Sequence, residues 1–88
     1  MSAKNLSQLR TQVSQIDTEI LILLERRMQL AVKIGRRKKQ MGKPIFDEQR
    51  EVLLLLDLKK QLANTDLPVE KTLEIWGKIL EISRDMQC

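Results

Sequence analysis

The sequence predicts an all-α protein, and two observations carry this prediction. Apolar residues recur in steps of three and four along most of the chain, which is the spacing of one helical face rather than of a strand. The chain also has only two prolines, three glycines and few β-branched runs, so little interrupts a helix. Its 88 residues predict one domain over residues 1–88, near the size at which a single core becomes marginal.

The first predicted helix extends from about residue 6 to about residue 40. Asn5 or Ser7 can cap its start, and Gly42 followed by Pro44 ends it. A helix of this length is roughly 50 Å long. One of its faces is an apolar seam with a single polar interruption, made of Leu6, Leu9, Val13, Ile16, Ile20, Leu23, Arg27, Leu30 and Ile34.

Two shorter helices are predicted to follow. Asp47 is a good N-cap for a helix over about 47–63, whose run Leu53 to Leu56 is apolar nearly all round. The stretch "NTDLP" has turn chemistry, and Pro68 suits the first turn of a third helix over about 68–87. The inner face of that helix is predicted to contain Val69, Thr72, Leu73, Trp76, Ile79 and Leu80.

The helix lengths predict a dimer. The two shorter helices are each roughly 25 to 30 Å long and would pack antiparallel, so they cover only about half of the first helix. The rest of the seam would face water, as an apolar patch larger than soluble monomers usually tolerate. We therefore expect an intertwined homodimer of three-helix protomers in which the long helices pair.

Polar side chains stand where the seam predicts apolar ones. At 100° per residue, Arg27 and Lys38 fall within about 20° of each other and roughly 16 Å apart along the axis. The small residues Ala31 and Gly35 lie between them, which leaves room for a small molecule. The alternative is that Arg27 sets helix register and that Lys38 extends to water.

The other helices carry similar candidates. Ser83 and Gln87 continue the inner stripe of the third helix one turn apart, unless that end only frays into solvent. The second helix opens with Asp47, Arg50 and Glu51, which could also be a cap and ordinary first-turn charges.

Arg10 stands apart from this set. It lies about 25 Å along the axis from Arg27, too far to share a small ligand within one protomer. In an antiparallel dimer, however, the partner's Arg10 would reach the other chain's site; otherwise Arg10 is an ordinary surface arginine.

Taken together, these residues predict an anion-binding site without a nucleophile or a neutral-pH base. The chain has no histidine and no tyrosine, and its one cysteine is the last residue, Cys88. An enzyme built this way would act by charge placement and substrate orientation rather than by proton transfer. The single terminal cysteine, together with the absence of a long apolar run and of a signal-peptide pattern, predicts a soluble cytoplasmic protein without a membrane span.

Four stretches of the chain resemble the all-helical type of chorismate mutase, an isomerase of the shikimate pathway to phenylalanine and tyrosine. They are "LRTQVSQID" (Leu9 to Asp17), "LLERRMQLAVKIGRRK" (Leu23 to Lys38), "PIFDEQRE" (Pro44 to Glu51) and "EISRDMQ" (Glu81 to Gln87). Their order and separations are similar to those of the family over almost the full length.

The resemblance implies a pericyclic rearrangement of chorismate to prephenate without cofactor or metal. It implies that Arg27 and the partner chain's Arg10 hold the substrate carboxylates, helped by Ser83 and Arg50. It further implies that Asp47 and Glu51 lie at the ring hydroxyl, and that Lys38 and Gln87 donate to the ether oxygen, where negative charge develops.

Three alternatives remain at this point. Relatives with the same fold cleave isochorismate to salicylate and pyruvate, but they depart from the pattern found here around Asp47, Glu51 and Ser83. A non-catalytic dimer could bind nucleic acid through "RRKK" (Arg36 to Lys39), although these four basic residues point in all directions and few aromatic residues accompany them. The chain could also be a regulatory module that binds chorismate or prephenate for a larger enzyme.

Overall fold

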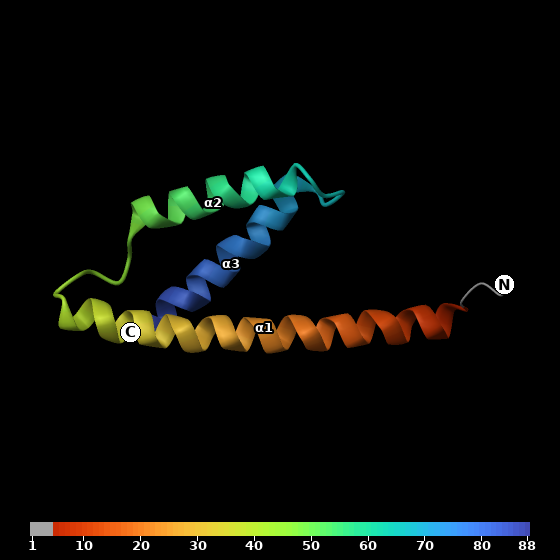
Figure 1. The fold of residues 1–88 in the computed structure, drawn as a ribbon, viewed down its shortest axis with the longest axis horizontal. Helices are drawn as coiled ribbons and strands as arrows, with labels where there is room; N and C mark the ends of the chain where they lie inside the picture. Colours follow the sequence, from red (N-terminus) through yellow and green to blue (C-terminus); the bar gives the residue numbers. More distant parts are fainter. Residues whose placement is uncertain (1–4) are drawn as a thin grey trace.

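The computed structural model describes residues 5–88, and these residues form three α-helices and no strand. The helices are α1 (Leu6–Gln40), α2 (Glu48–Leu62) and α3 (Val69–Gln87) (Figure 1). The predicted all-α, three-helix architecture is therefore confirmed, and the observed helix ends lie within one residue of the expected ones.

Both ends of α1 are fixed by local chemistry. Asn5 and Gln8 form a capping box, in which each side chain accepts a hydrogen bond from the other residue's backbone N–H. At the other end, Gly42 has a φ of 69°, a left-handed conformation that glycine adopts without strain. The N–H of Lys43 then donates to the carbonyl of Lys38 over 2.8 Å, as in a Schellman motif. This motif fixes the backbone of Lys38 at the point where the chain leaves α1.

The two shorter helices start differently. Asp47 is the N-cap of α2, since its Oδ1 accepts a hydrogen bond from the Arg50 N–H over 3.1 Å. Pro68 is the N-cap of α3 and offers no side-chain hydrogen bond. Within the turn between them, the Thr65 hydroxyl donates to the Leu62 carbonyl and accepts from the Leu67 N–H.

The helices are not arranged as three parallel layers. α3 starts beside the end of α2 and runs diagonally to the carboxyl-terminal half of α1, so α2 and α3 diverge from their shared turn (Figure 1). α3 contacts both other helices, whereas the backbones of α1 and α2 do not approach each other closely within the described residues. The expectation that α2 and α3 together cover half of α1 was wrong, because among the described residues only α3 comes close to α1, and α2 contacts α3 instead.

The close contact between α1 and α3 depends on Gly35. A Cβ built at this position would lie 2.5 Å from the backbone oxygen of Gln87, closer than real Cβ contacts allow. Gly35 is buried, but it contacts the end of α3 and does not line the pocket described below. The sequence predicted that Ala31 and Gly35 both leave room for a ligand. In the structure, only Ala31 of these two lines the pocket.

One protomer encloses only a small apolar core. The buried apolar side chains among the described residues are Met28, Ala31, Leu62 and Leu80. Beyond α3, the seam of α1 is 46–61% exposed at each of Leu6, Leu9, Val13, Ile16 and Ile20. The protomer measures 60 × 25 × 16 Å with a radius of gyration of 17.0 Å, against about 12 Å for a compact chain of this length. No helix in the described part of the chain combines the length and apolar character that crossing a membrane requires.

Candidate active site

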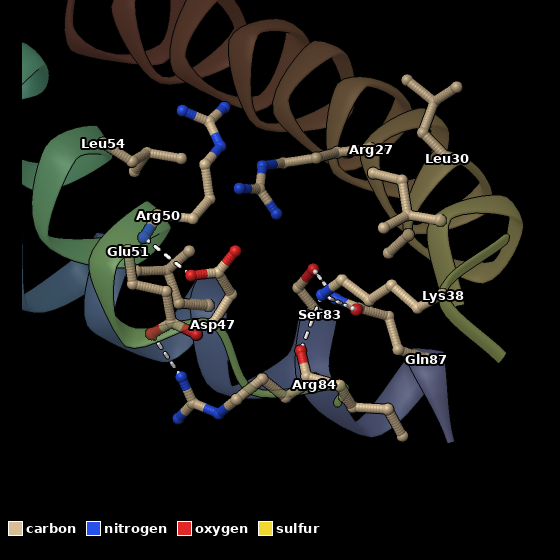
Figure 2. A pocket seen from close by; sticks show the side chains of 14 residues that line it. Arg27, Leu30, Lys38, Asp47, Arg50, Glu51, Leu54, Ser83, Arg84 and Gln87 are labelled. Atoms are coloured by element: carbon tan, nitrogen blue, oxygen red, sulfur yellow. Dashed lines mark hydrogen bonds and ion pairs between the residues drawn. The ribbon is translucent and has the colours of Figure 1, made fainter. Parts of the chain in front are cut away.

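A pocket of about 420 Å³ lies between the carboxyl-terminal half of α1, the start of α2 and the end of α3 (Figure 2). This volume is in the usual range for sites that hold small molecules. Seven of the eight residues that the sequence singled out line it: Arg27, Lys38, Asp47, Arg50, Glu51, Ser83 and Gln87. They come from all three helices, so the divergence of α3 from α2 opens the space that these side chains share.

Arg10 is not part of this pocket. It is exposed near the other end of α1, where it lines a shallow hollow with Leu6, Ser7, Thr11 and Ser14. The structure therefore separates Arg10 from the other candidates within one protomer, as the spacing along the helix predicted.

Lys38 is held by two oxygen atoms at one side of the pocket. Its Nζ donates to the Ile45 carbonyl over 2.6 Å and to Gln87 Oε1 over 2.7 Å. An ammonium group has three N–H donors, so one remains for a ligand. The backbone and the side chain of Lys38 are thus both anchored, which limits the positions that this donor can take.

Gln87 has its orientation set by the same contact. Because Oε1 accepts from Lys38, the amide NH₂ is turned to the other side, where Nε2 lies 3.4 Å from Ser83 Oγ. Ser83 is buried. Lys38, Gln87 and Ser83 therefore form a short chain of polar groups across α1 and α3, with donors facing the pocket (Figure 2).

Arg27 and Arg50 lie near each other on the opposite side of the pocket from Lys38 and Gln87 (Figure 2). Neither guanidinium has an ion pair or a hydrogen bond with the described residues. Arg27 is half-buried, and unpaired cations in such positions favour an anionic ligand.

Glu51 and Arg84 form an ion pair that the sequence did not predict. Arg84 Nη1 donates to Glu51 Oε1 over 2.5 Å, which joins α3 to α2. This hydrogen bond is the main cause that raises the pKa of Arg84. The guanidinium also lies 5.3 Å from the centre of the Phe46 ring, a cation–π distance. The only feature of the sequence that could have pointed to Arg84 as a pocket residue was its position next to Ser83, on the flank of the inner stripe of α3.

The remaining wall is apolar, and the charge of the pocket is positive. Leu30, Ile34, Leu54 and Leu80 supply aliphatic surface. Four cationic side chains, namely Arg27, Lys38, Arg50 and Arg84, face two acidic ones, Asp47 and Glu51, for a net charge of +2. No group of three or more metal-ligating side chains occurs among residues 5–88. The arrangement suits a small, partly apolar dianion that also carries a hydrogen-bonding group.

The fold and the pocket together define an all-helical protein with a pocket of net positive charge, and comparison with known proteins gives the family. The family model for chorismate mutase type II matches residues 9–88. The chain therefore belongs to the chorismate mutase type II family, and chorismate mutases are isomerases.

Individual relatives agree with this membership. The chain is 34% identical over 80 residues to the bifunctional chorismate mutase/prephenate dehydratase of Aquifex aeolicus, in a match that covers 88% of the chain and 22% of that protein. It is 27% identical over 78 residues to the T-protein of Enterobacter agglomerans, covering 89% of the chain and 21% of that protein. The chain thus spans about a fifth of the length of these relatives.

A solved structure has a similar fold over its whole length. It is a conserved hypothetical protein from Pyrococcus furiosus, with a TM-score of 0.74 and 31% sequence identity. The match covers 99% of this chain and 100% of the other.

Proposed function

We propose that the protein is a chorismate mutase that converts chorismate to prephenate, in the biosynthesis of phenylalanine and tyrosine. The observation that carries this proposal is the convergence of two anchored donors, Lys38 and Gln87, and two unpaired arginines, Arg27 and Arg50, on one pocket. Family membership supports the same reaction.

The two carboxylates of chorismate account for the unpaired cations. Arg27 and Arg50 would bind one end of the dianion, because a guanidinium matches a carboxylate with two parallel hydrogen bonds. Ser83 would add a neutral hydrogen bond. The aliphatic wall of Leu30, Ile34 and Leu54 would cover the ring and the enolpyruvyl group.

The donors on the other side act on the breaking bond. As the C–O bond of chorismate breaks, negative charge builds on the ether oxygen. The free N–H of Lys38 and the Nε2 of Gln87 would donate to this oxygen, and they would do so more strongly in the transition state than in the substrate. Because Lys38 is already fixed by Ile45 and Gln87, little reorganisation accompanies the reaction.

The remaining acidic residues would contact the ring hydroxyl. Asp47 uses its side-chain Oδ1 as the cap of α2, and its backbone would meet the substrate. Glu51 would accept a hydrogen bond from the hydroxyl. The reaction needs no proton transfer, which is consistent with a chain that contains no histidine.

The complete site would be formed in a homodimer. The exposed seam of α1 supports a two-fold, antiparallel pairing of α1 with its copy, centred roughly midway between positions 10 and 27. Ile16 and Ile20, which lie on the seam near that centre, are 53% and 55% exposed in the protomer and need a partner surface. In this arrangement the partner's Arg10 enters the pocket beside Arg27. A cytoplasmic location remains part of the proposal.

The test follows the loss of chorismate absorbance with purified protein. The wild type should turn over chorismate, and Lys38→Ala and Arg27→Ala should each lower kcat/KM by at least about 100-fold, the usual cost of an oxyanion donor. Lys78→Ala is the matched control, since Lys78 pairs only with exposed Glu81 and should leave activity unchanged. Absence of turnover by the wild type, or full activity in both site variants, would contradict the proposal. Turnover of isochorismate instead would favour the lyase.

A further inference from the structure

The Glu51–Arg84 pair is the feature of the pocket that the proposed function leaves unexplained. It joins residues 33 positions apart on α2 and α3, and its side chains are 20% and 34% exposed, respectively. Arg84 uses Nη1 to bind Glu51 Oε1, and Glu51 Oε2 has no hydrogen bond with any residue in the described range 5–88. One oxygen of the carboxylate is therefore occupied, and the other is available to a ligand.

A free carboxylate in this position would oppose substrate binding. Chorismate brings two negative charges into the pocket, and like charges a few ångströms apart in a partly buried site repel by about 1–4 kcal/mol. Glu51 is nevertheless suited to accept a hydrogen bond from a hydroxyl, because its Oε2 has no hydrogen bond with the described residues. The site therefore needs Glu51 as a hydrogen-bond acceptor, but with its negative charge balanced by a nearby cation.

We propose that Arg84 is a positioning residue that neutralises Glu51 and directs its free oxygen, Oε2, to the ring hydroxyl of the substrate. This inference rests on the proposed function. Arg84 does not itself contact the substrate in this arrangement, since its guanidinium lies on the far side of Glu51 from the unpaired arginines (Figure 2).

Phe46 helps to fix the position of the Arg84 guanidinium. The guanidinium lies 5.3 Å from the Phe46 ring centre, so it is held by a ring on one side and by a carboxylate on the other. Phe46 directly follows Ile45, whose carbonyl anchors Lys38. The short segment before α2 therefore supports both the donor at one side of the pocket and the acceptor at the other.

The competing interpretation is that the pair only ties α2 to α3. A structural tie would affect the stability of the fold, whereas a positioning role affects the affinity for a hydroxyl-bearing dianion and depends on the charge of Glu51. The two roles are separated by measuring ligand binding and stability in the same variants.

The variants are Arg84→Met, which removes the charge and keeps an apolar chain against Phe46, and Arg84→Lys, which keeps the charge. Lys78→Met is the matched control, because it removes an equal charge and an exposed ion pair from the same helix. Each protein is assayed for kcat and KM with chorismate, for the Kd of prephenate by calorimetry, and for thermal unfolding. Prephenate retains both carboxylates and the ring hydroxyl, so the binding arm does not depend on turnover.

We expect Arg84→Met to raise KM and the Kd of prephenate about tenfold, with a smaller change in kcat. This is the effect of losing an interaction that stabilises the bound substrate and the transition state equally. Arg84→Lys should recover most of the affinity, and Lys78→Met should change neither constant.

A double-mutant cycle completes the test. In the Glu51→Gln background there is no carboxylate to neutralise, so Arg84→Met should raise Kd several-fold less than in the wild type. Unchanged affinity in Arg84→Met, or an equal rise in both backgrounds, would overturn the inference. Either result, alongside turnover of chorismate by the wild type, would leave the proposed function standing.

Discussion

Gly35 shows how a single residue without a side chain can determine the geometry of a site. It lets the backbone of Gln87 approach α1 so closely that a built Cβ would lie 2.5 Å from the Gln87 oxygen and 2.7 Å from its Cα. The Gln87 side chain then reaches Lys38, one turn further along α1. The contact between Lys38 and Gln87 thus depends on the absence of atoms at position 35.

This contact leads to a prediction about Gly35→Ala. The added methyl group pushes the end of α3 outward, because its neighbours are the backbone oxygen, the Cα and the Cβ of Gln87, which a side-chain rotation cannot move away. We expect a loss of roughly 1–3 kcal/mol in the free energy of unfolding, as for other overpacked sites. We also expect at least a tenfold decrease in kcat, since Gln87 leaves its position beside Lys38. Urea unfolding and steady-state kinetics check the two effects.

Gly77 is the matched control for this substitution. A Cβ at position 77 meets nothing within 4 Å, and the residue is exposed on α3. Gly77→Ala should therefore stabilise the helix by roughly 0.5–1 kcal/mol, the difference in helix propensity, and leave kcat unchanged. Equal losses of activity at positions 35 and 77 would show that the approach to Gln87 is not the cause.

At the scale of elements, Asp47 at the start of α2 combines the role of a helix cap with a position in the pocket wall. Its Oδ1 caps the helix at the Arg50 N–H, while the residue also lines the pocket. A cap stabilises an otherwise unpaired N–H and orients the first turn, which carries Arg50 and Glu51. The direction of two site residues is thus set by the side chain of a third.

The two roles of Asp47 can be separated by substitution. Asp47→Ala removes the cap and should lower the free energy of unfolding by about 1 kcal/mol. Asp47→Asn keeps a cap oxygen and should retain nearly all of the stability. If Asp47 meets the substrate through its backbone, Asp47→Asn should also keep KM within about threefold of the wild type, since a good cap preserves that backbone. A large rise in KM in a fully stable Asp47→Asn protein would assign the contact to the carboxylate instead.

The helices were predictable from sequence, because the signals that start and stop them are local. Asn5, Asp47 and Gly42 act within three or five residues of their own positions, and each was recognisable as a cap or a stop. The position of the end of α3 against α1 was not predictable, because the close approach of Gln87 to Gly35 joins residues 52 positions apart.

The candidate site was predictable for the same kind of reason, with one exception. Arg27, Lys38, Ser83 and Gln87 are polar residues on otherwise apolar stripes, so each stands out on its own helix. Arg84 lies on the flank of the inner stripe of α3, where an arginine is common. Only its ion pair with Glu51 on α2 distinguishes it. Periodicity along one helix contains no information about such a pair.

At the scale of the whole molecule, the described residues leave more large apolar side chains exposed than they bury. The apolar seam of α1 continues well beyond α3, and the pocket lacks Arg10. Pairing of two protomers along α1 would cover the seam and would bring the partner's Arg10 to the pocket.

If the protein is the proposed dimer, disruption of the pairing along α1 should dissociate it. Ile16→Glu introduces a charge into the seam at a position that is 53% exposed in the protomer and remote from the pocket. We expect the mass in solution, measured by light scattering, to fall from about twice to once the protomer mass of 10.3 kDa, with loss of most activity. Ile16→Val keeps the seam apolar and should behave as the wild type. A wild type that is active at the protomer mass would contradict the dimer.

The contribution of Arg10 to the partner's site can be tested without any structural measurement, by mixing two inactive variants. Arg10→Ala and Arg27→Ala should each have little activity as homodimers. When equal amounts are unfolded together and refolded, half of the dimers are mixed, and in each of these one site has Arg27 from one chain and Arg10 from the other. The second site of the same dimer lacks both. Two-fold symmetry therefore predicts recovery of about a quarter of the wild-type activity. If Arg10 acted within its own chain, no combination would restore a complete site, and the mixture would remain as inactive as its components.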